Sequence, residues 1–112
     1  MRKVIFTINF FVLVLSLHAQ RTVTGRIVES GTNDGVIGAS IMVYKGQGTD
    51  IKTYVPTLKG TVTDIDGKYE LSLEPDENAF TITYVGFVSQ TIFVTAESTY
   101  NIGLKADTKL LE

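Results

Sequence analysis

The chain has 112 residues, with ten Lys and Arg against twelve Asp and Glu, one histidine and no cysteine. This length allows a single domain, and the absence of cysteine excludes disulfides and thiolate metal sites. The acidic balance, without a cluster of basic residues, argues against a nucleic-acid partner, because phosphate backbones are bound through Lys and Arg.

Residues 1–19 have the pattern of a secretory signal peptide. Two basic residues follow the first methionine, an apolar run continues to Leu17, and the small residue Ala19 stands where a signal peptidase cuts. The run is shorter than the ~20 residues that span a bilayer, although Leu17 replaces the small residue usual at position −3. We therefore expect export and a mature chain that begins at Gln20. An uncleaved membrane anchor or a buried helix is the alternative.

After residue 19 the sequence alternates apolar and polar residues with a period of two, which is typical of β-strands with one buried face. A short strand at residues 61–63 continues this pattern. In the remaining strands the alternation directs these positions inward: Val23, Gly25, Ile27, Ala39, Ile41, Val43, Tyr69, Leu71, Leu73, Phe80, Ile82, Tyr84, Ile92, Val94, Tyr100, Ile102 and Leu104. Seven short strands separated by turn residues predict an all-β domain over residues 20–104, folded as a seven-stranded antiparallel β-sandwich with Greek-key connections.

Three segments lie between or beyond these strands. Residues 46–58 predict a long polar loop that contains Pro56, and residues 105–112 predict a C-terminal tail that leaves the sandwich. Residues 64–67 end in Asp-Gly, a strong signal for a tight turn. We expect a hairpin there, with a type I′ turn that needs a positive φ at Gly67.

The sequence offers little for catalysis or metal binding. Its one histidine, His18, lies in the segment expected to be removed, so Ser-His-Asp systems and the usual zinc sites lack their imidazole. Two groups of acids, Asp64 with Asp66 and those at 74–77, are interpreted as solvated turn residues. The Asp64-x-Asp66-Gly pattern is similar to the start of a calcium loop but lacks the third ligand and the distant glutamate. We therefore predict no catalytic residue, no cofactor site, no metal ligand and no enzyme activity.

Aromatic residues give only weak support to sugar binding. The chain has no tryptophan, and its tyrosines mostly fall at core positions, with Tyr44 and Tyr54 as exceptions. A secreted surface or adhesion module that binds glycan or protein remains the alternative function. It would need an exposed ligand patch, such as one around Tyr54.

Several segments together resemble the carboxypeptidase regulatory-like domain. Residues 23–27 (VTGRI) and 35–41 (GVIGASI) are similar to its opening VTGxV…PLIGASV, and residues 60–69 (GTVTDIDGKY) to its GTVTDxDGxY/F segment. Residues 83–87 (TYVGF) are similar to SYVGY, and residues 107–112 (DTKLLE) to its usual ending. The ending matches the version of the domain found at the N-terminus of TonB-dependent outer-membrane nutrient transporters of the Bacteroidetes type.

The resemblance implies a transthyretin-like, immunoglobulin-like sandwich with no catalytic residues to transfer. It also implies a place in the periplasm or at the outer membrane, and a protein partner such as a transporter plug or a periplasmic protein. We therefore expect a non-catalytic accessory domain with a docking or spacer role and no small-molecule substrate. In those transporters a TonB box, plug and barrel follow. The sequence ends at Glu112, so a transporter fragment and a free-standing copy both remain open.

Overall fold

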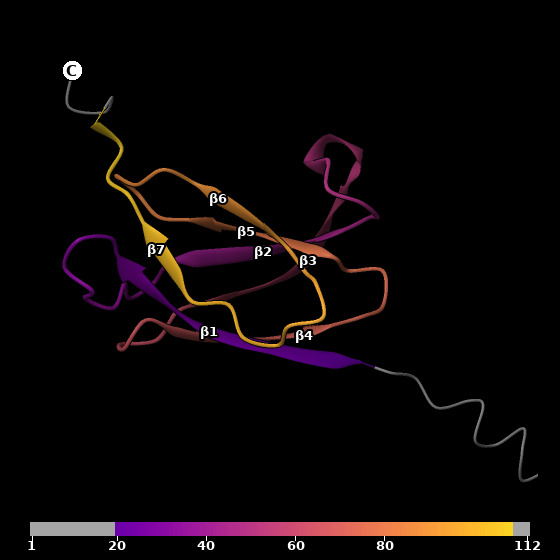
Figure 1. Cartoon of the computed structure of the whole chain (residues 1–112), viewed down its shortest axis with the longest axis horizontal. Coiled ribbons are helices and arrows are strands. Elements are labelled where there is room, and N and C mark those ends of the chain that lie inside the picture. Colours follow the sequence, from indigo (N-terminus) through magenta and orange to yellow (C-terminus); the bar gives the residue numbers. More distant parts are fainter. Residues whose placement is uncertain (1–19, 109–112) are drawn as a thin grey trace, which may run out of the picture.

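The structure is a computed structural model that describes residues 20–108; the predicted signal peptide and residues 109–112 lie outside this part. Figure 1 shows two β-sheets packed against each other. The three-stranded sheet has the order β4 (Lys68–Leu73), β1 (Arg21–Glu29), β7 (Ile102–Leu104). The four-stranded sheet has the order β3 (Val55–Val62), β2 (Ser40–Lys45), β5 (Ala79–Thr83), β6 (Gln90–Phe93), and a short 3-10 helix, η1 (Ile51–Thr53), precedes β3. The predicted all-β, seven-stranded sandwich is confirmed.

The core lies between the sheets and is built from the alternation that the sequence shows. Four further predicted positions, Tyr84, Ile92, Val94 and Tyr100, are partly buried and pack against this core. The buried core residues are Val23, Ile27, Val36, Ala39, Ile41, Val43, Tyr69, Leu71, Leu73, Phe80, Ile82, Ile102 and Leu104. All of these except Val36 were predicted to point inward. Within residues 20–108 the two sheets enclose this core, so this part of the chain is a folded unit with its own interior.

One strand pair departs from the predicted antiparallel arrangement. β7 pairs with β1 in parallel, with Ile27 opposite Ile102. The chain leaves β6 in the other sheet and returns along β1, where Thr24 donates its N–H to Ser98 O and Tyr100 donates its N–H to Thr24 O. This return path sets β7 in the same direction as β1.

The predicted loop at 46–58 is too long at its C-terminal end, because residues 55–58 belong to β3. Pro56 is tolerated there since β3 is the last strand of its sheet and needs no donor on its free side. A bulge shifts the register between β2 and β3, and Thr57 fills the gap. Its hydroxyl donates to Val43 O at 2.7 Å and accepts from the Lys59 N–H at 3.0 Å.

The segment predicted as a hairpin is a corner between the two sheets. β3 and β4 belong to different sheets, so the two strands are not paired with each other. The Gly67 N–H donates to Asp64 O at 2.9 Å, which closes the turn. Gly67 has φ +81°, as expected, but the central residues Ile65 and Asp66 lack the positive φ of a type I′ turn. The turn is therefore of type I with a left-handed glycine after it.

Gly67 also lies where three backbone segments meet. It accepts a 2.7 Å hydrogen bond from the Ile27 N–H, and Ile27 O accepts one of 2.9 Å from the Val36 N–H. A Cβ atom on Gly67 would collide with Ile27 O and would stand 2.9 Å from Gly35 Cα. Gly67 of the DIDGKY segment and Gly35, the first glycine of the GVIGASI segment, are therefore required by this close approach.

The first residues of the predicted tail remain attached to the sandwich. The Val88 N–H donates to Lys105 O, and the Asp107 N–H donates to Gly86 O, both at 2.9 Å. Ala106 forms an antiparallel bridge with Phe87. The expected departure from the sandwich therefore does not occur at residues 105–107.

Candidate functional site

The turn acids that resemble a calcium loop have a structural role. One oxygen of the Asp64 carboxylate accepts hydrogen bonds from the Asp66 and Lys68 N–H groups, each at 2.9 Å. The Arg26 side chain donates to the backbone oxygen of Asp66, at 2.9 Å. Asp64 therefore holds the corner between β3 and β4. No group of three His, Asp or Glu side chains within residues 20–108 could hold a metal ion.

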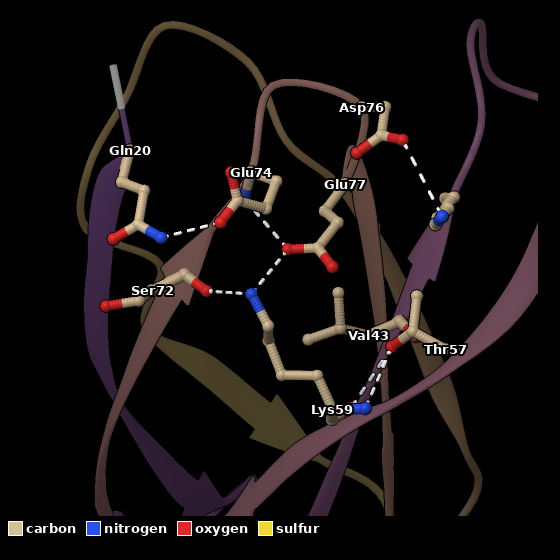
Figure 2. Close-up of polar contacts among 9 residues, drawn as sticks. Gln20, Val43, Thr57, Lys59, Ser72, Glu74, Asp76 and Glu77 are labelled. Carbon is tan, nitrogen blue, oxygen red and sulfur yellow. Dashed lines mark hydrogen bonds and ion pairs between the residues drawn. The ribbon is translucent and has the colours of Figure 1, made fainter. Parts of the chain in front are cut away.

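The second group of acids differs from its interpretation as solvated turn residues. Glu77 is only 6% exposed, and Figure 2 shows its carboxylate pointing toward the Lys59 amine. Lys59 Nζ lies 2.6 Å from Glu77 Oε1 and donates to Ser72 O at 2.8 Å. The same carboxylate oxygen accepts from the Glu74 N–H at 2.8 Å. The cluster joins the edge strand of one sheet to β4 of the other.

The protonation of Glu77 follows from these contacts. Burial by itself raises the pKa of the Glu77 carboxyl, because it disfavours the charged form. The hydrogen bond from the Glu74 N–H and the bond and charge of Lys59 act in the opposite direction and outweigh burial. The pKa of Glu77 therefore lies below its ordinary value, and the carboxylate is ionised in the neutral range.

Tyr54, the residue on which an aromatic ligand patch would depend, is not on the surface. It is 7% exposed, and its hydroxyl donates to Gly48 O at 2.7 Å. Its ring meets Phe93 edge-on, with centroids 5.7 Å apart, and lies against Gly46. The tyrosine fastens the 46–54 loop onto the four-stranded sheet, so the proposed patch does not exist around it.

An apolar surface is found instead along β3. The strand has the reverse of the usual polarity, since its half-buried positions carry Thr57, Lys59 and Thr61 while its exposed positions include Leu58 and Val62. We call Met42, Leu58 and Val62 the apolar edge. Leu58 is fully exposed, and Met42, on the neighbouring strand β2, is also exposed.

A shallow depression lies within the apolar edge. Gly60 is opposite Met42 across the β2–β3 pair and leaves a gap between Leu58 and Val62. A Cβ atom on Gly60 would stand 2.5 Å from Ile41 O, so no larger residue fits there without movement. The arrangement supports binding through apolar contact and backbone groups.

Sequence reasoning missed the apolar edge because it assigned residues 55–58 to a loop. The signal was present as a period-two alternation from Thr57 to Val62 with apolar residues at the even positions. Pro56 and Gly60, both rare in strands, concealed it. Residues 55–58 are therefore the first part of an edge strand with an apolar outer face.

The described part of the chain contains no helix of the length and hydropathy needed to cross a membrane.

Comparison with known proteins identifies one family. The family model described as the CarboxypepD_reg-like domain matches residues 23–112. The chain is 31% identical over 108 residues to TonB-dependent receptor P39 of Formosa agariphila, an alignment that covers 96% of this chain and 9% of the receptor. It is 32% identical over 100 residues to TonB-dependent receptor SusC of Bacteroides thetaiotaomicron, covering 89% of this chain and 9% of that receptor. The chain thus spans about a tenth of the length of these relatives.

Solved structures share the fold at low identity. A streptococcal ancillary pilin superposes with a TM-score of 0.56 and 16% identity, over 80% of this chain and 30% of the pilin. The C-terminal domain of the shaft pilin SpaA from Lactobacillus rhamnosus GG superposes with a TM-score of 0.51 and 15% identity, over 80% of this chain and 99% of that domain. These matches support the β-sandwich alone.

Proposed function

We propose, because this chain belongs to the CarboxypepD_reg-like domain family, that it serves as a non-catalytic accessory domain of a TonB-dependent outer-membrane transporter. The observation that carries the proposal is the coverage of the alignments to two receptors. They include almost all of this chain and only 9% of either receptor. The chain therefore corresponds to one module of such a receptor, and its complete core fits a module that folds by itself.

A docking or spacer role agrees with the path of the chain. In Figure 1 the described chain enters β1 at one end of the sandwich and leaves after β7 at the other. The exit is held by the bonds of Lys105 and Asp107 to the β5–β6 connection. A domain threaded in this way holds its own N-terminus and the exit of its chain at opposite ends of a folded body.

The DNA that follows codon 112 tests the transporter assignment. A reading frame that encodes a plug and a β-barrel, continuous with this chain or immediately next to it, is the expected result. Unrelated genes after a stop codon would contradict the assignment and favour a free-standing role.

Export is part of the same proposal. The basic start, the apolar run and Ala19 lead us to expect periplasmic or outer-membrane-associated protein whose N-terminus is Gln20. Intact-mass measurement of the protein in cell fractions tests this. Recovery of the exported chain, from the periplasmic or outer-membrane fraction, with Met1 still attached would refute cleavage at this site.

The proposed lack of catalysis is tested directly. The purified chain from Gln20 to Glu112 is incubated with a panel of peptide and glycoside substrates, and no turnover above buffer is expected. Turnover that a single substitution abolishes would overturn the proposal. The alternative, a surface or adhesion module that binds glycan or protein, would need an exposed ligand patch, and Tyr54, the residue named as an example of one, is buried.

A further inference from the structure

The free side of β3 carries backbone groups without a neighbouring strand. β3 is the last strand of its sheet. The Thr63 N–H donates to Ala39 O, so Thr61, two residues earlier, also directs its backbone groups toward β2. In an antiparallel pair this direction alternates. Gly60 and Val62 therefore direct their N–H and C=O groups away from the sheet, which is a template for another strand.

The exposed face of β3 carries a protruding side chain and a depression that could fit together. Leu58 is a fully exposed apolar side chain, and Gly60, two residues along the same strand, lies at the depression bordered by Val62 and Met42. Two residues of a strand span about 7 Å. A twofold axis between the protrusion and the depression would place the protrusion of each copy against the depression of the other. Such an interface is self-complementary, because each copy offers both features.

We propose that two copies of this domain pair through β3, antiparallel and related by a twofold axis at Lys59. In this register Leu58 of one copy stands opposite Gly60 of the other and fills its depression, and the reciprocal contact is identical. Pro56 stands opposite Val62 at each end of the paired segment. The two four-stranded sheets become one continuous sheet of eight strands, with an apolar stripe on its outer face.

Neighbouring registers fit less well. An axis at Gly60 sets the glycines opposite each other and leaves both depressions empty. An axis at Thr61 sets Leu58 opposite Asp64, an apolar side chain against a carboxylate. The axis at Lys59 brings two lysines together, but each is already bound to its own Glu77 at 2.6 Å. This partly buried ion pair therefore reduces the charge repulsion between the two lysines that this register would otherwise meet.

The occupant of the apolar edge is thus a second copy of the chain, and this inference goes beyond the accessory role proposed above. It needs no transporter to be tested. The chain from Gln20 to Glu112 contains both sheets and the entire core, so the isolated domain is a suitable sample.

Sedimentation equilibrium over a range of concentrations gives the first test. The wild-type domain is expected to shift from the mass of one chain to that of two as its concentration rises. The Leu58→Asp variant should raise the dissociation constant at least about tenfold. Val85→Asp is the matched control, because Val85 is an apolar residue, 88% exposed, that lies outside the apolar edge. It should dimerise like the wild type, with circular dichroism showing that both variants are folded.

Disulfide trapping tests the register. The natural sequence contains no cysteine, so any disulfide comes from introduced residues. Oxidising a mixture of Pro56→Cys and Val62→Cys domains should give a disulfide-linked heterodimer, while each variant alone should give little.

A domain that stays monomeric up to about 1 mM overturns the proposal. A dimer that Leu58→Asp leaves intact, or that Val85→Asp disrupts equally, shows that another surface is used. Equal crosslinking by either cysteine variant alone contradicts the register centred on Lys59.

Discussion

The phenol of Tyr69 donates a 2.6 Å hydrogen bond to the backbone oxygen of Tyr100, directly over Gly25. Tyr69 comes from β4, Tyr100 precedes β7, and Gly25 lies in β1 between them. Burial, and to a smaller extent Tyr100, raise the pKa of Tyr69, so its hydroxyl remains a donor. The bond ties β4 to the segment before β7 across the central strand β1, and Gly25, the glycine of the VTGRI segment, leaves room for it.

Removing this bond should weaken the fold. Tyr69→Phe leaves the oxygen of Tyr100 without its donor, and we expect a loss of about 1–3 kcal/mol in the free energy of unfolding. Tyr44→Phe removes a hydroxyl from a half-exposed tyrosine on the outer face of β2 and should cost little. Urea unfolding of both variants compares them. Equal losses would show that the bond over Gly25 contributes nothing specific.

The register of β4 gives a second prediction. Leu71 is buried between the sheets and Glu70 is exposed on the opposite face. Leu71→Ala should therefore destabilise by about 2–5 kcal/mol, and Glu70→Ala by less than about 0.5 kcal/mol. If urea melts show similar small effects for both, the strand is displaced by one residue from the register described here.

Two glycines with the same backbone angle separate strain from collision. Gly67 has φ +81° and Gly48 has φ +82°, but only Gly67 lies against neighbouring backbone. Alanine at either position costs about 1–2 kcal/mol for the left-handed conformation. Gly67→Ala should cost clearly more, because Ile27 O and Gly35 occupy the space of its methyl group. Thermal unfolding of the pair measures the difference, and equal melting temperatures would refute the close approach.

The Glu77 cluster predicts how stability depends on pH. The folded-state pKa of Glu77 lies below its ordinary value of 4.5. Its stabilising effect is therefore fully present above that value and is lost as the pH falls through the lower, folded-state pKa. Urea unfolding from about pH 7 to pH 3 should show this acid-side decline, and Glu77→Gln should flatten it. Glu70→Gln, at an exposed site, is the control. A Glu77→Gln profile parallel to wild type would contradict the assignment.

Metal removal should have no effect on the fold. One oxygen of the Asp64 carboxylate already accepts two backbone hydrogen bonds. EDTA and millimolar calcium should both leave the melting temperature unchanged, as scanning calorimetry can determine. A rise of several degrees with calcium would mean that the ion binds the folded state in preference to the unfolded chain.

Much of the sandwich could be predicted because its central strands have one face in the core. The alternation around Ile41, Leu71 and Phe80 identifies the inward side chains correctly. The rule that inward positions are apolar failed for β3, because its inward positions are only half-buried and hold polar residues such as Lys59. There the pairing of Lys59 with Glu77, 18 residues away, takes the place of apolar burial.

Other features could not be predicted because they depend on contacts between distant segments of the chain. Tyr54 was expected on the surface, but Phe93 and Gly46 enclose it. Strand direction is also a long-range property, since the parallel course of β7 follows from the return of the chain along β1. Local periodicity shows which face of a strand is apolar, but it does not show which strand lies at the edge of its sheet.

The parallel pairing of β1 with β7 has a mechanical consequence. Figure 1 places the start of β1 and the end of β7 at opposite ends of the sandwich, with Ile27, Val28 and Glu29 paired to Ile102, Gly103 and Leu104. Tension applied through the two ends of the domain would pull these strands past each other along their length. The hydrogen bonds between them would then bear the force together, as in shear, and would not open one after another like a zipper. The sandwich is therefore expected to stay folded under a pull between its own N-terminal end and the segment that leaves β7.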